Sequence, residues 1–365
     1  MSRARDIADL AGSADAGGLT GRNLIINGAM TVAQRGTSST SSGYQTVDRF
    51  RNDYSGASVT QSQQVLSSGD PYDAGFRYFY RHENTATSSA TSAQLQVFQF
   101  VEAQNIAGSG WNYISTSSSV TVSFWVRSSL AGTYVFNMQS VDGTAQNYST
   151  QFTLSANTWT KVTKTIPGNA NLQFDNNSER GMWVNFMVHL GTDYTDSGFT
   201  HDSWAAYSGS SRAGDFGQNW CNTASATFDI TGVQLELGET ATPFEHENYG
   251  TTLAKCQRYF EKMGGESSYA PIGQGSQRTT TETYFHVYFK QTKRAAPTVG
   301  FINNVIVTDR LAFDQVVSNI GANHPSVFGF HGHFNHSSVG SGNRPLFVCS
   351  GPTAPFGYMT FDSEL

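Results

Sequence analysis

Histidines crowd one stretch near the C-terminus, and histidine is the commonest metal-binding side chain. The residues concerned are His324, His331, His333 and His336. On a strand, His331 and His333 would point both imidazoles to one face, as a metal site needs. Gly332 and Asn335 favour a loop instead, in which these rings are simply solvated. A transition-metal site at His331 and His333 is therefore a hypothesis, in which a trimer of this region would place the imidazoles of three chains around one ion.

Residues for catalysis are harder to find. Glycoside hydrolysis needs two carboxylates facing one cleft, and no pair among the 28 Asp and Glu residues lies in a recognisable motif. Neither a nucleophile sequence between strand and helix nor a Gly-rich phosphate loop is present. Cys221, Cys256 and Cys349 contain no CxxC pair and are expected to be buried thiols. The sequence predicts a protein without catalysis, and a polysaccharide depolymerase with a dispersed site is the less favoured alternative.

Aromatic side chains offer a different chemistry. Exposed rings stack on the faces of sugars while amides bind the hydroxyl groups. Candidate glycan-binding rings in Gly-, Ser- and Asn-rich surroundings are Trp111, Tyr113, Trp204, Tyr207 and Trp220. For each of them, burial under a long loop or at a subunit contact is an equally favoured alternative.

A second group of rings accompanies the turn-like stretch at 318–343. It comprises Phe328, Phe330, Phe334 and Phe347, and we select Phe330 and Phe334 as candidate receptor contacts. Rings among small polar residues give large contact area with adaptable hydrogen bonding. Packing of the same rings at the tip of an oligomer is the alternative.

Strands must position most of these residues. Apolar residues alternate with polar ones, and Gly, Asn, Asp or Ser turns bound each run, at 119–127, 132–138, 158–166, 181–189 and 226–237. Residues 23–28 are expected to form a first strand, with Leu24 and Ile26 facing one way, beside the last strand. Many short strands without intervening helices predict an antiparallel sandwich. Further runs at 283–289 and 298–302 predict a second, smaller C-terminal β domain that ends in a loop-rich tail.

One connecting helix is predicted at 249–263, where apolar residues recur at helical spacing and Gly264 follows. Because it is apolar on more than one face, we expect it to be buried between chains. This predicts a homo-oligomer, a trimer, whose interface residues are Leu253, Cys256, Tyr259, Phe260 and Met263. Residues 1–21 form a separate short helical arm, with Ile7 and Leu10 on one side, too small to stay folded alone.

Composition limits the partners. Charged residues make up 14% of the chain and the net charge is −6, which argues against nucleic acid as a partner because that binding depends on Lys and Arg. No apolar run has the length of a membrane span. The N-terminus lacks the apolar core of a signal peptide. We therefore expect synthesis in a cytoplasm and neither membrane insertion nor nucleic-acid binding.

Two parts of the chain are similar to a known family. Residues 23–37 (NLIINGAMTVAQRGT) and 46–50 (TVDRF) resemble the opening of a bacteriophage fibre domain with a carbohydrate-binding-module-like jelly roll. Residues 228–245 resemble the last strand and exit of that domain. Residues 249–260 (YGTTLAKCQRYF) resemble the helix that follows it in tail fibres and related virion proteins.

This resemblance implies a jelly-roll domain at 22–245 and a connecting helix at 246–265. It stops at the helix, and residues 266–365, whose composition differs, are expected to form a C-terminal domain that recognises the host. The resemblance further implies a tail fibre of the virion that acts outside the cell and attaches to a glycan or protein receptor on the host surface. Residues 1–21 would anchor the fibre to the tail or another virion protein. A head fibre, or another purely structural virion component, is the alternative.

A structural calcium ion is common in such jelly rolls, near the first and last strands. The resemblance makes Asp229 its most plausible carboxylate ligand. Met30 and Thr31 stand where those modules commonly have an aromatic and an acidic residue, so one ligand is missing. We therefore expect no cofactor and favour Asp229 as a simple turn or strand-edge residue, with a structural calcium as the less favoured alternative.

Overall fold

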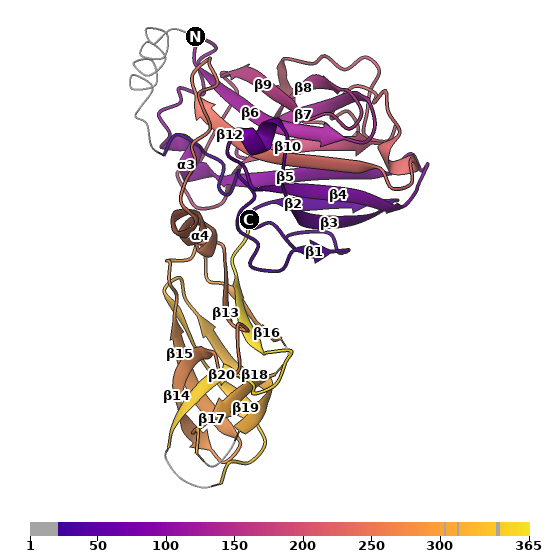
Figure 1. The fold of residues 1–365 in the computed structure, drawn as a ribbon. Helices are drawn as coiled ribbons and strands as arrows, with labels where there is room; N and C mark the ends of the chain where they lie inside the picture. The colour runs from indigo at the N-terminus through magenta and orange to yellow at the C-terminus, as the bar shows by residue number, and fades with distance from the viewer. Residues whose placement is uncertain (1–20, 303, 312–313, 341–343) are drawn as a thin grey trace. The chain divides into compact units, whose positions relative to one another are not determined.

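The structure is a computed structural model that describes residues 21–302, 304–311, 314–340 and 344–365 (Figure 1). Two compact units divide the chain, and the boundary between them lies between Thr252 and Leu253. The predicted anchor residues Ile7 and Leu10 lie outside the described residues.

The first unit is an antiparallel jelly-roll sandwich, as predicted. Its first sheet has, in spatial order, β1 (Ser38–Ser39), β3 (Ser58–Val65), β4 (Tyr78–Ala86), β12 (Thr227–Leu237), β6 (Ser119–Ser128) and β9 (Thr160–Pro167). Its second sheet has β11 (Trp204–Ala206), β8 (Gln146–Leu154), β7 (Gly132–Ser140), β10 (Arg180–Leu190), β5 (Gln94–Glu102) and β2 (Arg51–Ser55). Short helices α2 (Asp70–Asp73), α3 (Ala103–Ala107) and the 3-10 turn η1 (Trp220–Asn222) lie in the connections.

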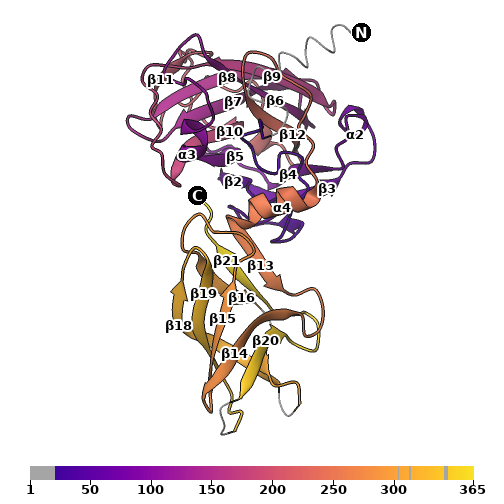
Figure 2. The same cartoon turned by 90° about the vertical axis from the view of Figure 1, so that its left-hand side faces the viewer.

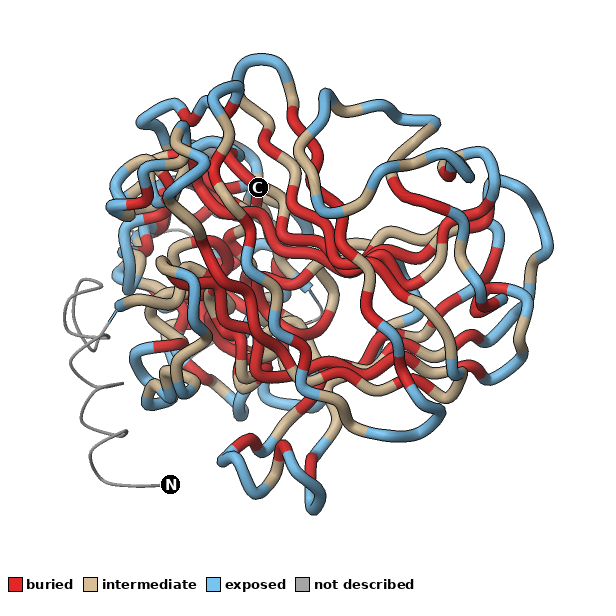
Figure 3. Tube along the Cα trace, turned by 90° about the horizontal axis from the view of Figure 1, so that it is seen from above, coloured by how far each residue is buried: buried red, intermediate tan, exposed pale blue. Residues whose placement is uncertain are grey.

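The core of this unit lies between the two sheets. Period-two spacing explains it, because Val122, Phe124 and Val126 of β6 point inward and are buried. Figure 3 shows buried residues along the middles of the strands and exposed residues mainly in the loops. The predicted strands of this region are confirmed as β6, β7, β9, β10 and β12.

The segment 23–28 lies beside β12, as predicted, but it is not a strand, so that part of the prediction is wrong. The amide of Leu24 donates to the carbonyl of Leu235 at 2.9 Å, and the amide of Val233 donates to the carbonyl of Gly28 at 3.0 Å. Asn27 has φ 61°, which turns the chain. Ile25, rather than its two neighbours, is consequently the buried residue.

The second unit contains a closed antiparallel barrel and a small sheet (Figures 1 and 2). The barrel has, in order, β14 (Pro271–Thr279), β15 (Glu282–Tyr288), β19 (Gly329–His336), β18 (Asp314–Pro325), β17 (Val305–Thr308) and β20 (Pro345–Ser350). The small sheet has β13 (Phe260–Gly264), β21 (Tyr358–Asp362) and β16 (Thr298–Ile302). The C-terminal β domain is thus confirmed, but its expected loop-rich stretch at 318–343 is largely the paired strands β18 and β19.

The predicted helix at 249–263 is wrong in its second half. Helix α4 spans Tyr249–Gln257, and the chain continues as β13, in which Phe260 pairs with Asp362 and Met263 with Met359. Strand pairing with a segment about one hundred residues away overrides the helical spacing.

This change removes the argument for a trimer through that helix. Cys256, Tyr259, Phe260 and Met263 are already buried within one chain, and Leu253 is half-buried. Their apolar surface therefore needs no partner chain, and the interface assignment loses its basis. The trimer itself stays a prediction. Within the described part of the chain, no helix is both long and apolar enough to cross a membrane.

Candidate functional site

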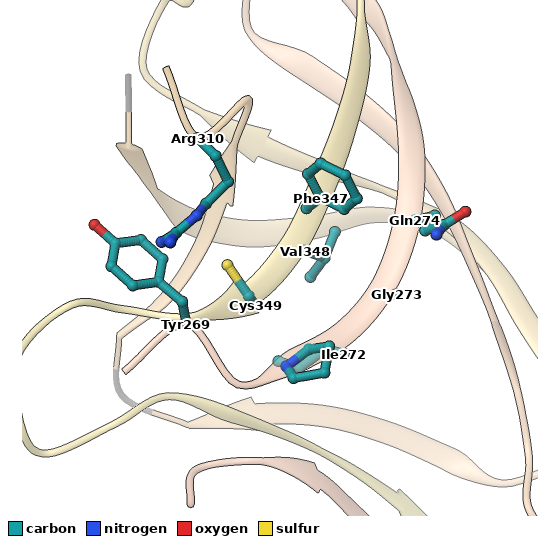
Figure 4. Close-up of a pocket in the computed structure, with 9 residues that line it drawn as sticks. Tyr269, Ile272, Gly273, Gln274, Arg310, Phe347, Val348 and Cys349 are labelled. Carbon is teal, nitrogen blue, oxygen red and sulfur yellow. The ribbon is translucent and has the colours of Figure 1, made fainter. Parts of the chain in front are cut away.

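A pocket on the surface of the barrel is a candidate binding site of the second unit (Figure 4). Its volume is about 390 Å³, within the range of small-ligand sites. Its lining residues come from β14, β20, the approach to β14 and the end of β17: Tyr269, Pro271, Ile272, Gly273, Gln274, Arg310, Phe347, Val348 and Cys349.

Strand alternation places the ring of Phe347 in this pocket. Along β20, Leu346 and Val348 point into the barrel core and are buried, so Phe347 between them points outward and is 45% exposed. In the ladder between β14 and β20, Gln274 is the direct partner of Phe347. Both residues line the pocket, and an amide with an aromatic ring is a combination suited to the hydroxyls and apolar face of a sugar.

Tyr269 and Arg310 form the opposite side of the pocket. The guanidinium carbon of Arg310 lies 3.7 Å from the centroid of the Tyr269 ring, a cation–π contact. Figure 4 shows the two groups side by side, with the sulfur of Cys349 directed toward them. Both residues have positive φ, 55° for Tyr269 and 64° for Arg310, which is uncommon for side chains of this size. Such conformations cluster at ligand sites, because the surrounding structure must hold them.

The tyrosine is fixed by a further contact. Its hydroxyl donates to Oδ2 of Asp314 at 2.5 Å. This hydrogen bond to a carboxylate raises the pKa of the Tyr269 hydroxyl, so the ring stays neutral at physiological pH. Asp314 at the start of β18 therefore orients the Tyr269 ring, and the ring in turn positions Arg310.

Cys349 lines the pocket with an unreactive thiol. It is buried, and burial raises its thiol pKa to about 11. A thiol with that pKa is protonated at neutral pH and is a poor nucleophile. No Asp, Glu or His is among the described lining residues. The site can bind a ligand through rings, an amide and a guanidinium, but it lacks a pair of groups for acid–base chemistry.

Sequence reasoning selected Phe347 only as one ring among several, and it missed Tyr269, Gln274 and Arg310. These residues meet because β14, β17 and β20 are neighbours in the barrel, at separations of tens of residues. No local motif signals them. The one available hint was an arginine beside Asp309 in a turn-like position.

Two of the predicted glycan-binding tryptophans are buried, so their assignment is wrong. Trp220 is 0% exposed in η1, and Trp111 is buried with its Nε1 donating to the carbonyl of Ser118 at 3.2 Å. Trp111 also packs near the rings of Tyr113 and Phe174. A ring enclosed in this way has no free face for a sugar.

The other three rings of that group are half-buried. Trp204 donates from Nε1 to the carbonyl of Pro167 at 2.7 Å and packs against Tyr148. Tyr113 packs edge-on against Phe174. The amide of Tyr207 donates to the carbonyl of Ala145. Trp204, Tyr113 and Tyr207 do not converge in the pocket of the barrel.

Phe330 and Phe334 are also wrong as receptor contacts. Both are buried in the barrel core, where Phe334 stacks on Phe285 at a centroid distance of 4.0 Å. Because they lie on β19 rather than in a loop, period-two alternation turns them inward. The exposed phenylalanines of the group are Phe328 and Phe347.

The histidines lie on strands, so His331 and His333 do share the outward face of β19. His331 stands directly across from His286 on β15 and from His324 on β18. Nε2 of His333 lies 3.5 Å from a carboxylate oxygen of Glu282. Within the described residues, no group of three or more metal-ligating side chains could hold an ion. The shared metal site of three chains remains an untested prediction.

Asp229 has a role other than calcium binding. It is buried in β12, and its Oδ1 accepts a hydrogen bond from Nε of Arg81 at 2.8 Å. Its Oδ2 accepts one from Nη2 of Arg127 at 2.6 Å. The hydrogen bond to Asp229 raises the pKa of the Arg81 guanidinium. Two cations occupy the carboxylate and would repel Ca²⁺, which argues against Asp229 as a calcium ligand.

No protein-family profile and no curated protein matches this sequence. Solved structures resemble parts of its fold. The enzymatically active domain of tailspike protein 4 from bacteriophage CBA120 has a TM-score of 0.34 and 11% identity, over 59% of this chain and 21% of that chain. A CBM4 structure has a TM-score of 0.29 and 10% identity, over 58% and 98% of the two chains. Wild-type discoidin II from Dictyostelium discoideum has a TM-score of 0.17 and 11% identity, over 84% and 94%. At these values the likenesses carry no inference about what this chain binds.

Proposed function

We propose that this chain is a non-enzymatic attachment protein of a bacteriophage fibre, and that its second unit binds a saccharide on the host surface. The motifs at 23–50 and 228–260 support the virion assignment by their resemblance to fibre proteins. The pocket supports saccharide binding. Two aromatic rings, an amide and a guanidinium surround it, and a carboxylate pair is absent from its described lining.

The composition of the pocket carries this proposal. Phe347 provides an exposed ring for the apolar face of a pyranose, and Gln274 provides both a donor and an acceptor for hydroxyl groups. Such an open site binds a single sugar weakly. Several copies in an oligomeric fibre would raise the effective affinity through multivalency. We therefore retain the homotrimer, and the attachment of residues 1–21 to the virion, as parts of the proposal.

Binding of the labelled full-length chain to a panel of bacterial cells tests the proposal. The chain should bind selected strains, and purified surface polysaccharide from those strains should compete. Released reducing ends or unsaturated sugars, measured in the same incubation, would establish a depolymerase instead. If the chain assembles into virions but binds no cell or polysaccharide, the proposal fails and the chain is a purely structural component of the virion.

A matched pair of substitutions localises the binding. Phe347→Ala removes the exposed ring of the pocket, whereas Phe328→Ala removes a 67% exposed ring of the same unit that does not line it. We expect cell binding to fall with Phe347→Ala only. Equal binding by both variants and the unsubstituted chain would place the receptor site elsewhere.

A further inference from the structure

We infer that the pocket selects an acidic saccharide, one that carries a carboxylate or phosphate next to a pyranose ring, and that Arg310 is the residue that reads this charge. The inference rests on the proposed saccharide-binding function and goes beyond it by naming the class of sugar. The observation behind it is that the Arg310 guanidinium lines the pocket without a described carboxylate partner.

Arg310 differs from the other arginines of the barrel. Arg278 forms an ion pair with Glu282 at 2.9 Å, and Arg344 forms one with Asp309 at 3.3 Å. No carboxylate of the described residues forms an ion pair with Arg310, whose described side-chain contact is the ring of Tyr269. Its guanidinium lies against an aromatic face, and Arg310 is among the residues that line the pocket.

This arrangement matches the needs of anion recognition. A guanidinium presents parallel N–H donors to the two oxygens of a carboxylate or phosphate, which gives strong and directional hydrogen bonds. Stacking on Tyr269 fixes the plane of this fork before a ligand arrives, and the bond from Tyr269 to Asp314 fixes the ring in turn. Preorganisation of this kind reduces the entropic cost of binding.

The remaining lining supplies the rest of a sugar site. Phe347 and Gln274 are direct partners in the ladder between β20 and β14. Phe347 can therefore stack on the pyranose face and Gln274 can hydrogen-bond its hydroxyls, while Arg310 binds the anionic group. Asp314 is the acidic group near this charge, and it is engaged by the Tyr269 hydroxyl. Its negative charge would oppose an anion and so limits the affinity.

Matched monosaccharide pairs test the inference by NMR titration of the full-length chain. The probes are methyl glucuronide against methyl glucoside, and methyl galacturonide against methyl galactoside, which differ only in the carboxylate. The 6-phosphates of both glycosides form a third arm, which distinguishes a carboxylate from a phosphate source. We expect the acid of at least one pair, or its phosphate, to bind about tenfold more tightly than the neutral sugar. Equal binding within every pair would overturn the inference.

Substitutions separate this inference from the proposed function. Arg310→Gln should remove the preference for the charged sugar, so that the charged and neutral members of each pair bind with similar affinity. Asp314→Asn should strengthen binding of the charged sugar, and Arg278→Gln, at an arginine paired outside the pocket, should change nothing. Phe347→Ala should weaken both kinds of sugar. If Arg310→Gln has no effect while Phe347→Ala still abolishes binding, the charge inference fails and the saccharide site stands. If neither variant has an effect, both fail.

Discussion

Nζ of Lys293 lies 2.7 Å from Oε2 of Glu261, and both side chains are fully buried in the second unit. The same ammonium donates to the carbonyl of Gln257 at 2.5 Å, the last residue of α4. Burial lowers the pKa of Lys293, and the ion pair with Glu261 opposes that shift. One cation thus joins the end of the helix to the first strand of the small sheet.

Lys293→Met should destabilise the second unit strongly, because it leaves the Glu261 carboxylate buried without its partner. We expect a loss of about 3–5 kcal/mol in the free energy of unfolding, measured by urea denaturation. The double variant Lys293→Met with Glu261→Gln should recover much of this loss. Lys161→Met, at an exposed position on β9, is the control and should have little effect. Equal stability of the Lys293 variant and the control would contradict the role given to this pair.

His82 predicts how the stability of the first unit depends on pH. Its ring is completely buried, neither nitrogen has a hydrogen-bond partner among the described residues, and burial lowers its pKa to about 3. The unfolded chain, with a histidine pKa of about 6.5, therefore binds the proton first as the pH falls. The free energy of unfolding should therefore not depend on His82 above about pH 6.5. Between that pH and about pH 3 it should fall by up to about 1.4 kcal/mol per pH unit.

Denaturant unfolding of His82→Phe between pH 7 and pH 4 checks this dependence. The apolar ring should fit beside Tyr80, whose ring lies 4.3 Å from that of His82, and should flatten the pH profile. His286→Phe, at an exposed position of β15, should keep the profile of the unsubstituted chain. A His82→Phe profile as steep as that of the unsubstituted chain would rule out His82 as the titrating group.

Asp229→Asn should destabilise the sandwich without any link to calcium. The substitution removes the negative charge that holds Arg81 and Arg127 together at the surface of the first sheet. We expect a lower melting temperature in the variant, and no response of either protein to calcium or to a chelator at this residue. A melting temperature that calcium raises in the unsubstituted chain but not in Asp229→Asn would restore the calcium assignment.

The three cysteine thiols should not react with thiol reagents in the folded protein. Cys221, Cys256 and Cys349 are all buried and form no disulfide, and burial raises the pKa of Cys221 to about 12. A thiol reagent at pH 8 should therefore label them only after denaturation. Labelling of the native chain at the rate of a free thiol would contradict the burial described for them.

The sandwich could be predicted from the sequence because its strands carry their own signal. In β6 and β12, apolar residues recur at nearly every second position of a single segment, and this pattern requires no knowledge of the partner strand. The same rule failed where a long-range partner decides the structure. Phe260 and Met263 have helical spacing, but their backbone pairs with β21.

The candidate site shows a second limit of sequence reasoning. A Gly-, Ser- or Asn-rich context predicted exposure for Trp111 and Trp220, yet both rings are buried. Whether a ring is exposed depends on what folds over it. The pocket residues Tyr269, Arg310 and Phe347 come from separate strands and turns, so only the closed order of the barrel brings them together.

The most direct test of the saccharide site is the dissociation constant of one oligosaccharide for three proteins. The oligosaccharide is prepared from the surface polysaccharide of a strain that the full-length chain binds, and calorimetry compares the unsubstituted chain, Phe347→Ala and Phe328→Ala. Circular dichroism first confirms that all three are folded. We predict an increase in Kd of about tenfold or more for Phe347→Ala, from the loss of one stacked ring, and an unchanged Kd for Phe328→Ala. An unchanged Kd for Phe347→Ala would contradict the assignment of this pocket as the receptor site.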